Sequence, residues 1–145
     1  MTVYFVWDKT PRSYNCNNRQ KYKDKLKEAF SHIQCLYPFL PLSQALYSKI
    51  VYIHSSHSKI DVDNMSKPFI DAFNNIIYSD DAIINHRACS KIRLQDLSSY
   101  EVRLDLLPEP VAKKLDDLIS NRKKDIVYFE VGLFSSDMVS IGGEK

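Results

Sequence analysis

The chain contains little glycine, and the few glycines lie close to its C-terminal end. Only three of the 145 residues are glycine, and all three fall within the last fourteen positions: Gly132, Gly142 and Gly143. The loops that cradle phosphates in P-loop and dinucleotide-binding folds need clustered glycines between a strand and a helix. Because residues 1–131 contain none, the sequence excludes both kinds of nucleotide site from the body of the protein.

Cysteine is also scarce, and the long hydrophobic runs of membrane proteins are missing. The three cysteines (Cys16, Cys35 and Cys89) are odd in number and form no C-x-x-C pair, which excludes a disulfide framework and a cysteine-based zinc site. The apolar run at residues 3–7 stops at Asp8 and is too short for a signal peptide or a membrane span. We therefore expect free thiols and a soluble, cytoplasmic protein without a membrane partner.

An excess of one charge sign is missing overall, but the charges are sorted along the chain. The formal net charge is +2, from 20 basic and 18 acidic residues. Residues 9–28 carry seven basic and two acidic side chains, whereas residues 61–81 carry five acidic and one basic. A near-zero total therefore does not exclude a nucleic-acid partner, since a basic segment can bind phosphates while an acidic one holds a cation.

Length, composition and hydrophobic spacing predict one small α/β or α+β domain, with helices packed on a mixed sheet. We predict strands at 2–7, 47–54, 83–94, 100–107 and 126–131, and helices at 19–34, 64–77 and 110–122. The segment 100–107 alternates strictly between apolar and polar residues, which predicts antiparallel pairing with the strand before it. Pro68 is expected in the first turn of the second helix, whose start we place between residues 63 and 66.

These elements divide the chain into a core and a C-terminal addition. Residues 1–107 are expected to form a β-α-β-α-β-β core, and residues 108–134 to add a helix and a strand packed on the same domain. Residues 135–145 are expected to form a flexible tail.

The acidic segment contains two aspartate pairs, one at each end of the second predicted helix. Asp61 and Asp63 would project to the same side of an extended chain, and Asp80 and Asp81 follow the helix. Carboxylates held close together require a proton or a cation, and clustered aspartates suit Mg²⁺ or Mn²⁺. Such a site can activate water against a phosphodiester, and Lys67, one turn beyond Asp63, is placed to balance the charge that develops there.

Other interpretations of the same residues are weaker. Either aspartate pair alone is more typical of a helix cap or an acidic turn than of a site, but the pairs and the lysine together favour a site. An EF-hand fails because Ser66 stands where the loop needs glycine and Ala72 where it needs glutamate. The pair His54 and His57 lacks a third ligand for zinc.

The full pattern resembles a known family. It comprises Asp61-x-Asp63-Asn64-x-x-Lys67, then Asp71, Asn74 and Tyr78-x-Asp80-Asp81. It is similar to the RusA-type Holliday-junction resolvases, including phage and prophage members, specifically over about residues 59–93 and more loosely from the N-terminus to residue 107. The segment between Lys67 and Asp81 is one residue shorter than in some members, and the chain beyond Pro108 looks like an extension.

The resemblance implies a small α/β homodimer that cuts four-way DNA junctions with Mg²⁺ or Mn²⁺. It also implies that Asp61, Asp63 and Asp81 are catalytic metal ligands, that Lys67 is needed for cleavage and that Asp80 is a supporting acid.

An enzyme of this kind must grip DNA beside a site that is itself negative, which requires separate basic surfaces. We predict DNA contacts from the basic side chains and one tyrosine that lie outside the acidic segment. They are Arg12, Tyr14, Arg19, Lys21, Lys23, Arg87, Lys91 and Arg93. For each lysine the alternative is an ordinary solvated surface. Because a four-way junction is nearly two-fold symmetric, a C2 homodimer is expected.

The sequence thus predicts a metal-dependent endodeoxyribonuclease that resolves four-way junctions in DNA recombination and repair. A non-catalytic DNA-binding dimer of the same fold is the first alternative. Crowded carboxylates argue against it, because a site without catalysis has no physical reason to retain them. A metal-dependent nuclease acting on other branched or single-stranded DNA is the second.

Overall fold

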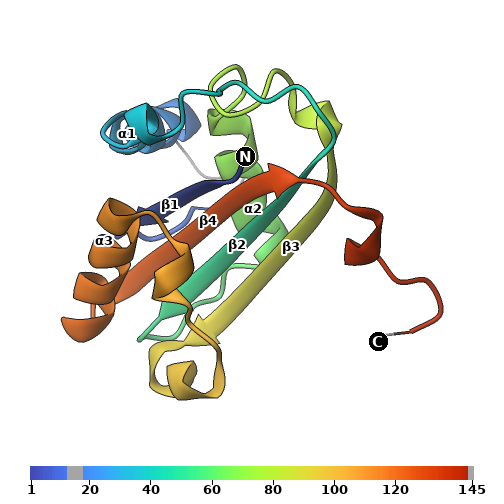
Figure 1. The fold of residues 1–145 in the computed structure, drawn as a ribbon. Coiled ribbons are helices and arrows are strands. Elements are labelled where there is room, and N and C mark those ends of the chain that lie inside the picture. The colour runs from blue at the N-terminus through green and yellow to red at the C-terminus, as the bar shows by residue number, and fades with distance from the viewer. Residues whose placement is uncertain (13–17, 144–145) are drawn as a thin grey trace.

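A four-stranded mixed sheet is the centre of the computed structural model, which describes residues 1–12 and 18–143 (Figure 1). The strands are β1 (Val3–Trp7), β2 (Leu46–His54), β3 (Ile84–Arg93) and β4 (Asp125–Leu133), in the order β1-β4-β2-β3. β2 and β3 run parallel, whereas β4 pairs antiparallel with both β1 and β2. The predicted α+β domain with helices on a mixed sheet is confirmed.

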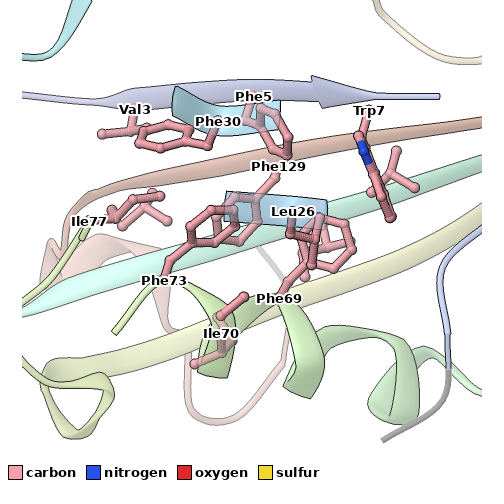
Figure 2. Close-up of a cluster of buried hydrophobic side chains, with 14 of the residues drawn as sticks. Val3, Phe5, Trp7, Leu26, Phe30, Phe69, Ile70, Phe73, Ile77 and Phe129 are labelled. Atoms are coloured by element: carbon pink, nitrogen blue, oxygen red, sulfur yellow. The ribbon is translucent and has the colours of Figure 1, made fainter. Parts of the chain in front are cut away.

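Two helices, α1 (Arg19–Ser31) and α2 (Val62–Ala72), pack on one face of this sheet and enclose the larger core. Figure 2 shows phenylalanine rings from both helices meeting those of the strands. Phe73, just after α2, has its ring centroid 5.3 Å from that of Phe30 in α1 and 5.6 Å from that of Phe129 in β4. Because these rings are fully buried, they fix how α2 lies on the sheet.

The third helix, α3 (Glu109–Ser120), covers part of the opposite face. Val111 and Leu115 of α3 join a second, smaller core with Val6, Ile53 and Ile126 of the sheet. Within residues 1–12 and 18–143, none of the helices has the length and apolar character needed to span a lipid bilayer.

The predicted strand at 100–107 is wrong. Short 3-10 helices form at Leu94–Ser99 and Leu104–Leu106 instead, and β3, the strand that was expected to pair antiparallel with this segment, is an edge strand that pairs in parallel with β2. The alternating residues Tyr100, Val102 and Leu106 are 50%, 42% and 54% exposed, so they do not form a buried strand face. Leu104 and Leu107 pack against the smaller core beside α3, and this packing holds the segment there.

The predicted limits of α2 are also wrong, because the helix begins earlier and ends five residues sooner than expected. Pro68 is therefore an interior, buried residue of α2 and not part of its first turn. After the helix, Asn75 adopts a left-handed conformation with φ 66° and starts a turn. That turn is held by the backbone of Leu42, which pairs with Ile77 at 2.8 Å and Ser79 at 2.9 Å. The turn buries Ile77, which mimics one more helical turn in the sequence pattern.

The last strand lies in the middle of the sheet, between β1 and β2, rather than at an edge. Its side chains Ile126, Val127, Phe129 and Val131 are all 0% exposed. The segment 108–134 therefore contributes both α3 and a central strand to the domain. Residues 135–143 lead away from the sheet (Figure 1) with exposed side chains, and their flexibility stays a prediction.

Candidate active site

A stripe of polar side chains runs along α2 on the side away from the core. Asp63, Lys67 and Asp71 follow one another at intervals of four residues, which places them on one helical face, and Asn74 follows in the turn just after the helix. Lys67 Nζ lies 3.8 Å from Asp71 Oδ1 and is one turn from Asp63. The stripe therefore connects the start of α2 with the turn that follows it.

Asp61 stands at the N-cap of α2, where the backbone is still extended (φ −74°, ψ 144°). Its carbonyl accepts the Met65 N–H at 3.1 Å, but its carboxylate makes no capping hydrogen bond with the described residues. Asp63 is already helical, so the expectation that both side chains project from an extended chain is wrong. Both side chains are exposed at the same end of α2, and that end carries the positive pole of the helix dipole.

Lys91 of β3 holds the loop that leads into Asp61. Its Nζ donates to the Ile60 carbonyl at 2.8 Å and to the Ser58 carbonyl at 3.3 Å. The sequence predicts Lys91 as a DNA contact, whereas the structure shows two of its three donor positions directed at this loop. Lys91 is therefore a positioning residue for the start of α2.

Replacing Lys91 with methionine keeps the apolar stem and removes these donors. We expect Lys91→Met to lower the free energy of unfolding by about 1–2 kcal/mol, because two half-buried carbonyls lose their partner. Urea denaturation measures this. Lys113→Met, on the exposed surface of α3, is the matched control and should change stability by less than about 0.5 kcal/mol. Equal stabilities of the two variants would contradict the role given to Lys91.

The second aspartate pair lies in the turn after α2. Asp80 Oδ1 accepts the Ala82 N–H at 3.1 Å and caps a short 3-10 helix, so its carboxylate serves the turn. The backbone N–H of Asp81 donates to Asn74 Oδ1 at 2.9 Å. Asn74, the last member of the polar stripe, therefore fixes Asp81 beside the end of α2.

The buried hydroxyl of Tyr78 lies close enough to the charged residues at this end of the site for them to change its pKa. It donates to the Ile70 carbonyl of α2. Burial raises the pKa of Tyr78 well above its usual value, and the negative charge of Asp81 raises it further. Arg87 of β3 lowers this pKa and Asp71 raises it. The charges of Asp71, Asp81 and Arg87 thus all act on the Tyr78 hydroxyl.

The pKa of the Cys89 thiol is affected in a similar way by residues near the start of α2. Burial raises the pKa of Cys89, and a hydrogen bond with Ser66 lowers it. Asp63 raises this pKa and Arg87 lowers it. Arg87 therefore lowers the pKa of both Tyr78 and Cys89. Its side chain is exposed and lies on the same side of β3 as Cys89.

The donor chemistry of the site suits a hard cation that keeps part of its water shell. In the part of the chain that the structure describes, no group of three or more His, Cys, Asp or Glu side chains lies close enough to hold a metal ion. Asp61, Asp63 and Asp81 therefore do not form a closed protein cage. Mg²⁺ is commonly bound through one or two carboxylates plus waters and substrate phosphates, so the pair Asp61 and Asp63 at the start of α2 fits Mg²⁺ or Mn²⁺. Asp81 lies at the other end of the helix.

The predicted basic residues lie around the same face of the sheet. Arg87, Lys91 and Arg93 share one side of β3, as their alternation predicts. Arg19, Lys21 and Lys23 lie on α1, which packs against α2. Arg12 is exposed, and its backbone N–H donates to the Tyr22 hydroxyl of α1 at 3.1 Å. Tyr14 lies outside the described residues.

A comparison of the sequence with family models shows its family. The model of endodeoxyribonuclease RusA matches residues 8–105, which is more than half of the chain. The chain belongs to the RusA family. It is thus a nuclease of the Holliday-junction-resolving endodeoxyribonucleases, as the sequence motif predicts. No curated protein matches the chain in a sequence search.

The RusA match covers every candidate catalytic residue but ends before α3 and β4. The central strand of this RusA-family sheet is therefore supplied by residues beyond the matched region. Two positioning residues were not given that role from the sequence: Ser66, which bonds the Asp63 carbonyl at 3.1 Å, and Lys91. Lys91 is a charged, half-buried residue within a strand, and a charge at such a position indicates a partner inside the protein.

Proposed function

We propose that this RusA-family enzyme cuts four-way DNA junctions by hydrolysis that depends on Mg²⁺ or Mn²⁺, with Asp61, Asp63 and Asp81 as ligands of one or two ions. The observation that carries the proposal is the polar stripe of α2, which has exposed or half-exposed carboxylates at both ends, with the exposed Arg87 on β3, the strand that packs against α2. DNA is the substrate class of the family.

Each side chain has a distinct task in the proposed reaction. When bound, a divalent cation lowers the pKa of a coordinated water and neutralises charge on the phosphate. Lys67 balances the charge that builds on the phosphate as the bond breaks, and Asp71, 3.8 Å away, orients it. Asp80 supports the site by capping the turn that presents Asp81. Lys91 keeps Asp61 in place through the preceding loop.

DNA is held outside the acidic stripe. We propose that Arg12, Tyr14 and the α1 residues Arg19, Lys21 and Lys23 bind phosphates or bases of one arm, while Arg87, Lys91 and Arg93 act close to the cut. A homodimer is the proposed assembly, since it places one site on each of two symmetric strands. We propose that the enzyme acts on DNA in the cytoplasm.

Cleavage of a synthetic four-way junction tests the proposed function. Purified protein should nick the junction in Mg²⁺, and chelation with EDTA should stop cleavage until Mg²⁺ or Mn²⁺ is restored. Fork, flap and single-stranded substrates assayed in parallel define the preference. Faster cutting of any of these would replace junctions as the proposed substrate, and binding without cutting in every divalent ion would contradict the proposed catalysis.

A further inference from the structure

A small hollow lies at the ends of the parallel strands β2 and β3, next to the loop that precedes α2. Its volume is about 210 Å³, and eight residues line it. Four of them are basic or imidazole side chains (His54, His57, Lys91 and Arg93), three are serines, and among these described residues none is acidic. We refer to it as the basic pocket.

The position of the basic pocket is typical of a ligand site. Ligands of open α/β sheets commonly bind beyond the carboxyl ends of parallel strands, and β2 and β3 both end here. Its volume is below the roughly 300 Å³ at which sites for drug-sized ligands begin, so it suits a small polar group.

The donors around the basic pocket suit an anion. His54 Nδ1 donates to the Ser56 carbonyl at 2.7 Å, so this hydrogen is used within the protein and the donors offered to an anion come from the serine hydroxyls, Lys91 and Arg93. Arg93 uses Nε for Asp96 Oδ2 at 3.2 Å, and a guanidinium has four further N–H donors.

The nearby carboxylate of Asp125 is used in other hydrogen bonds and does not occupy the basic pocket. Asp125, opposite His54 on β4, accepts hydrogen bonds from Thr10 at 2.9 Å and from Tyr52. The positively charged side chains of Lys91 and Arg93 in the lining argue against a metal ion at the two histidines.

We propose that the basic pocket binds a backbone phosphate of the DNA strand that is cut, a short distance from the cleaved bond. This inference rests on the proposed function. Lys91 lines the pocket and also donates to the Ser58 and Ile60 carbonyls, so one side chain connects the phosphate to the loop that carries Asp61. The bound phosphate sets the register of the strand against the site and reads no base sequence.

Salt dependence of junction binding is the first test, with Arg93→Gln as the variant. Loss of one phosphate contact should reduce the slope of log affinity against log salt concentration by about one. Arg103→Gln is the matched control, because Arg103 pairs with Glu101 at 3.4 Å and lines a different hollow, formed by the other face of the sheet. Equal slopes for both variants and the wild type would overturn the proposal.

The second test uses inorganic phosphate and no DNA, so that a surface contact of Arg93 is not mistaken for a pocket. Phosphate is titrated into the full-length protein at constant pH and ionic strength while the histidine ring signals are followed by NMR. His54 and His57 should shift saturably, the exposed His32 should not, and Arg93→Gln should weaken the response. Shifts that are absent, or equal for all histidines, would refute a built phosphate site.

The two proposals fail differently. If the wild type cuts junctions, but Arg93→Gln has the wild-type salt slope and phosphate shifts no histidine signal, then the basic pocket binds no phosphate and the proposed function stands. A protein that binds phosphate at His54 and His57 but does not cut DNA retains the pocket and loses the proposed function.

Discussion

Replacing Asp81 with asparagine is expected to abolish junction cleavage while leaving junction binding nearly unchanged. The substitution preserves the size of the side chain, and the bond to Asn74 is made by the backbone N–H of Asp81, so the turn should keep its shape. What is lost is the negative charge that the proposed metal requires. We expect the cleavage rate to fall by roughly 10³-fold or more.

Single-turnover cleavage in Mg²⁺ measures this loss, and a gel-shift assay without divalent ions measures binding. Asp116→Asn, on the exposed side of α3, makes the same chemical change away from the site and should cut at the wild-type rate. If Asp81→Asn also cuts at that rate, Asp81 is not a metal ligand. If it loses binding as well, its role is in holding the turn or the DNA.

Truncating Phe129 to alanine is expected to destabilise the whole domain. Its ring is 0% exposed and lies between α2 and the sheet, with ring centroids 5.5 Å from Phe69 and 5.6 Å from Phe73. Removing a phenylalanine from such a core costs about 3–5 kcal/mol, because the cavity left behind closes only in part. For a domain of ordinary stability this is a large share of the total.

Urea denaturation followed by circular dichroism gives the free energy of unfolding. Leu133→Ala is the control on the same strand, because Leu133 is 38% exposed, and it should cost much less. A loss of under about 1 kcal/mol for Phe129→Ala would mean that β4 is not the packed centre of the sheet.

Local pattern predicted most elements because their periodicity arises from burial on one face. α1, α3, β2 and β3 were predicted within a few residues. The segment 100–107 misled because its alternation resembles a half-buried strand, whereas its position depends on the packing of Leu104 and Leu107 beside α3. Nothing local indicates that β4 is inserted between β1 and β2, since sheet order is set by contacts distant in sequence.

The site was predictable to a similar degree. Spacing along α2 indicated that Asp63 and Lys67 share a face, and the paired aspartates indicated a cation. The sequence could not show that Asn74 holds the backbone of Asp81, or that Lys91 supports the loop before Asp61, because both contacts cross a turn or join two elements.

The central place of β4 also bears on how the chain folds as it is synthesised. β1 and β2 are neighbours in the sequence but not in the sheet, and each is hydrogen-bonded to β4 instead. During translation, β1 and the edge of β2 that pairs with β4 stay unpaired until residues 125–133 have left the ribosome. Until then, each presents an open strand edge that can pair with another chain. We infer that the nascent protein is most prone to aggregate just before its last strand is made.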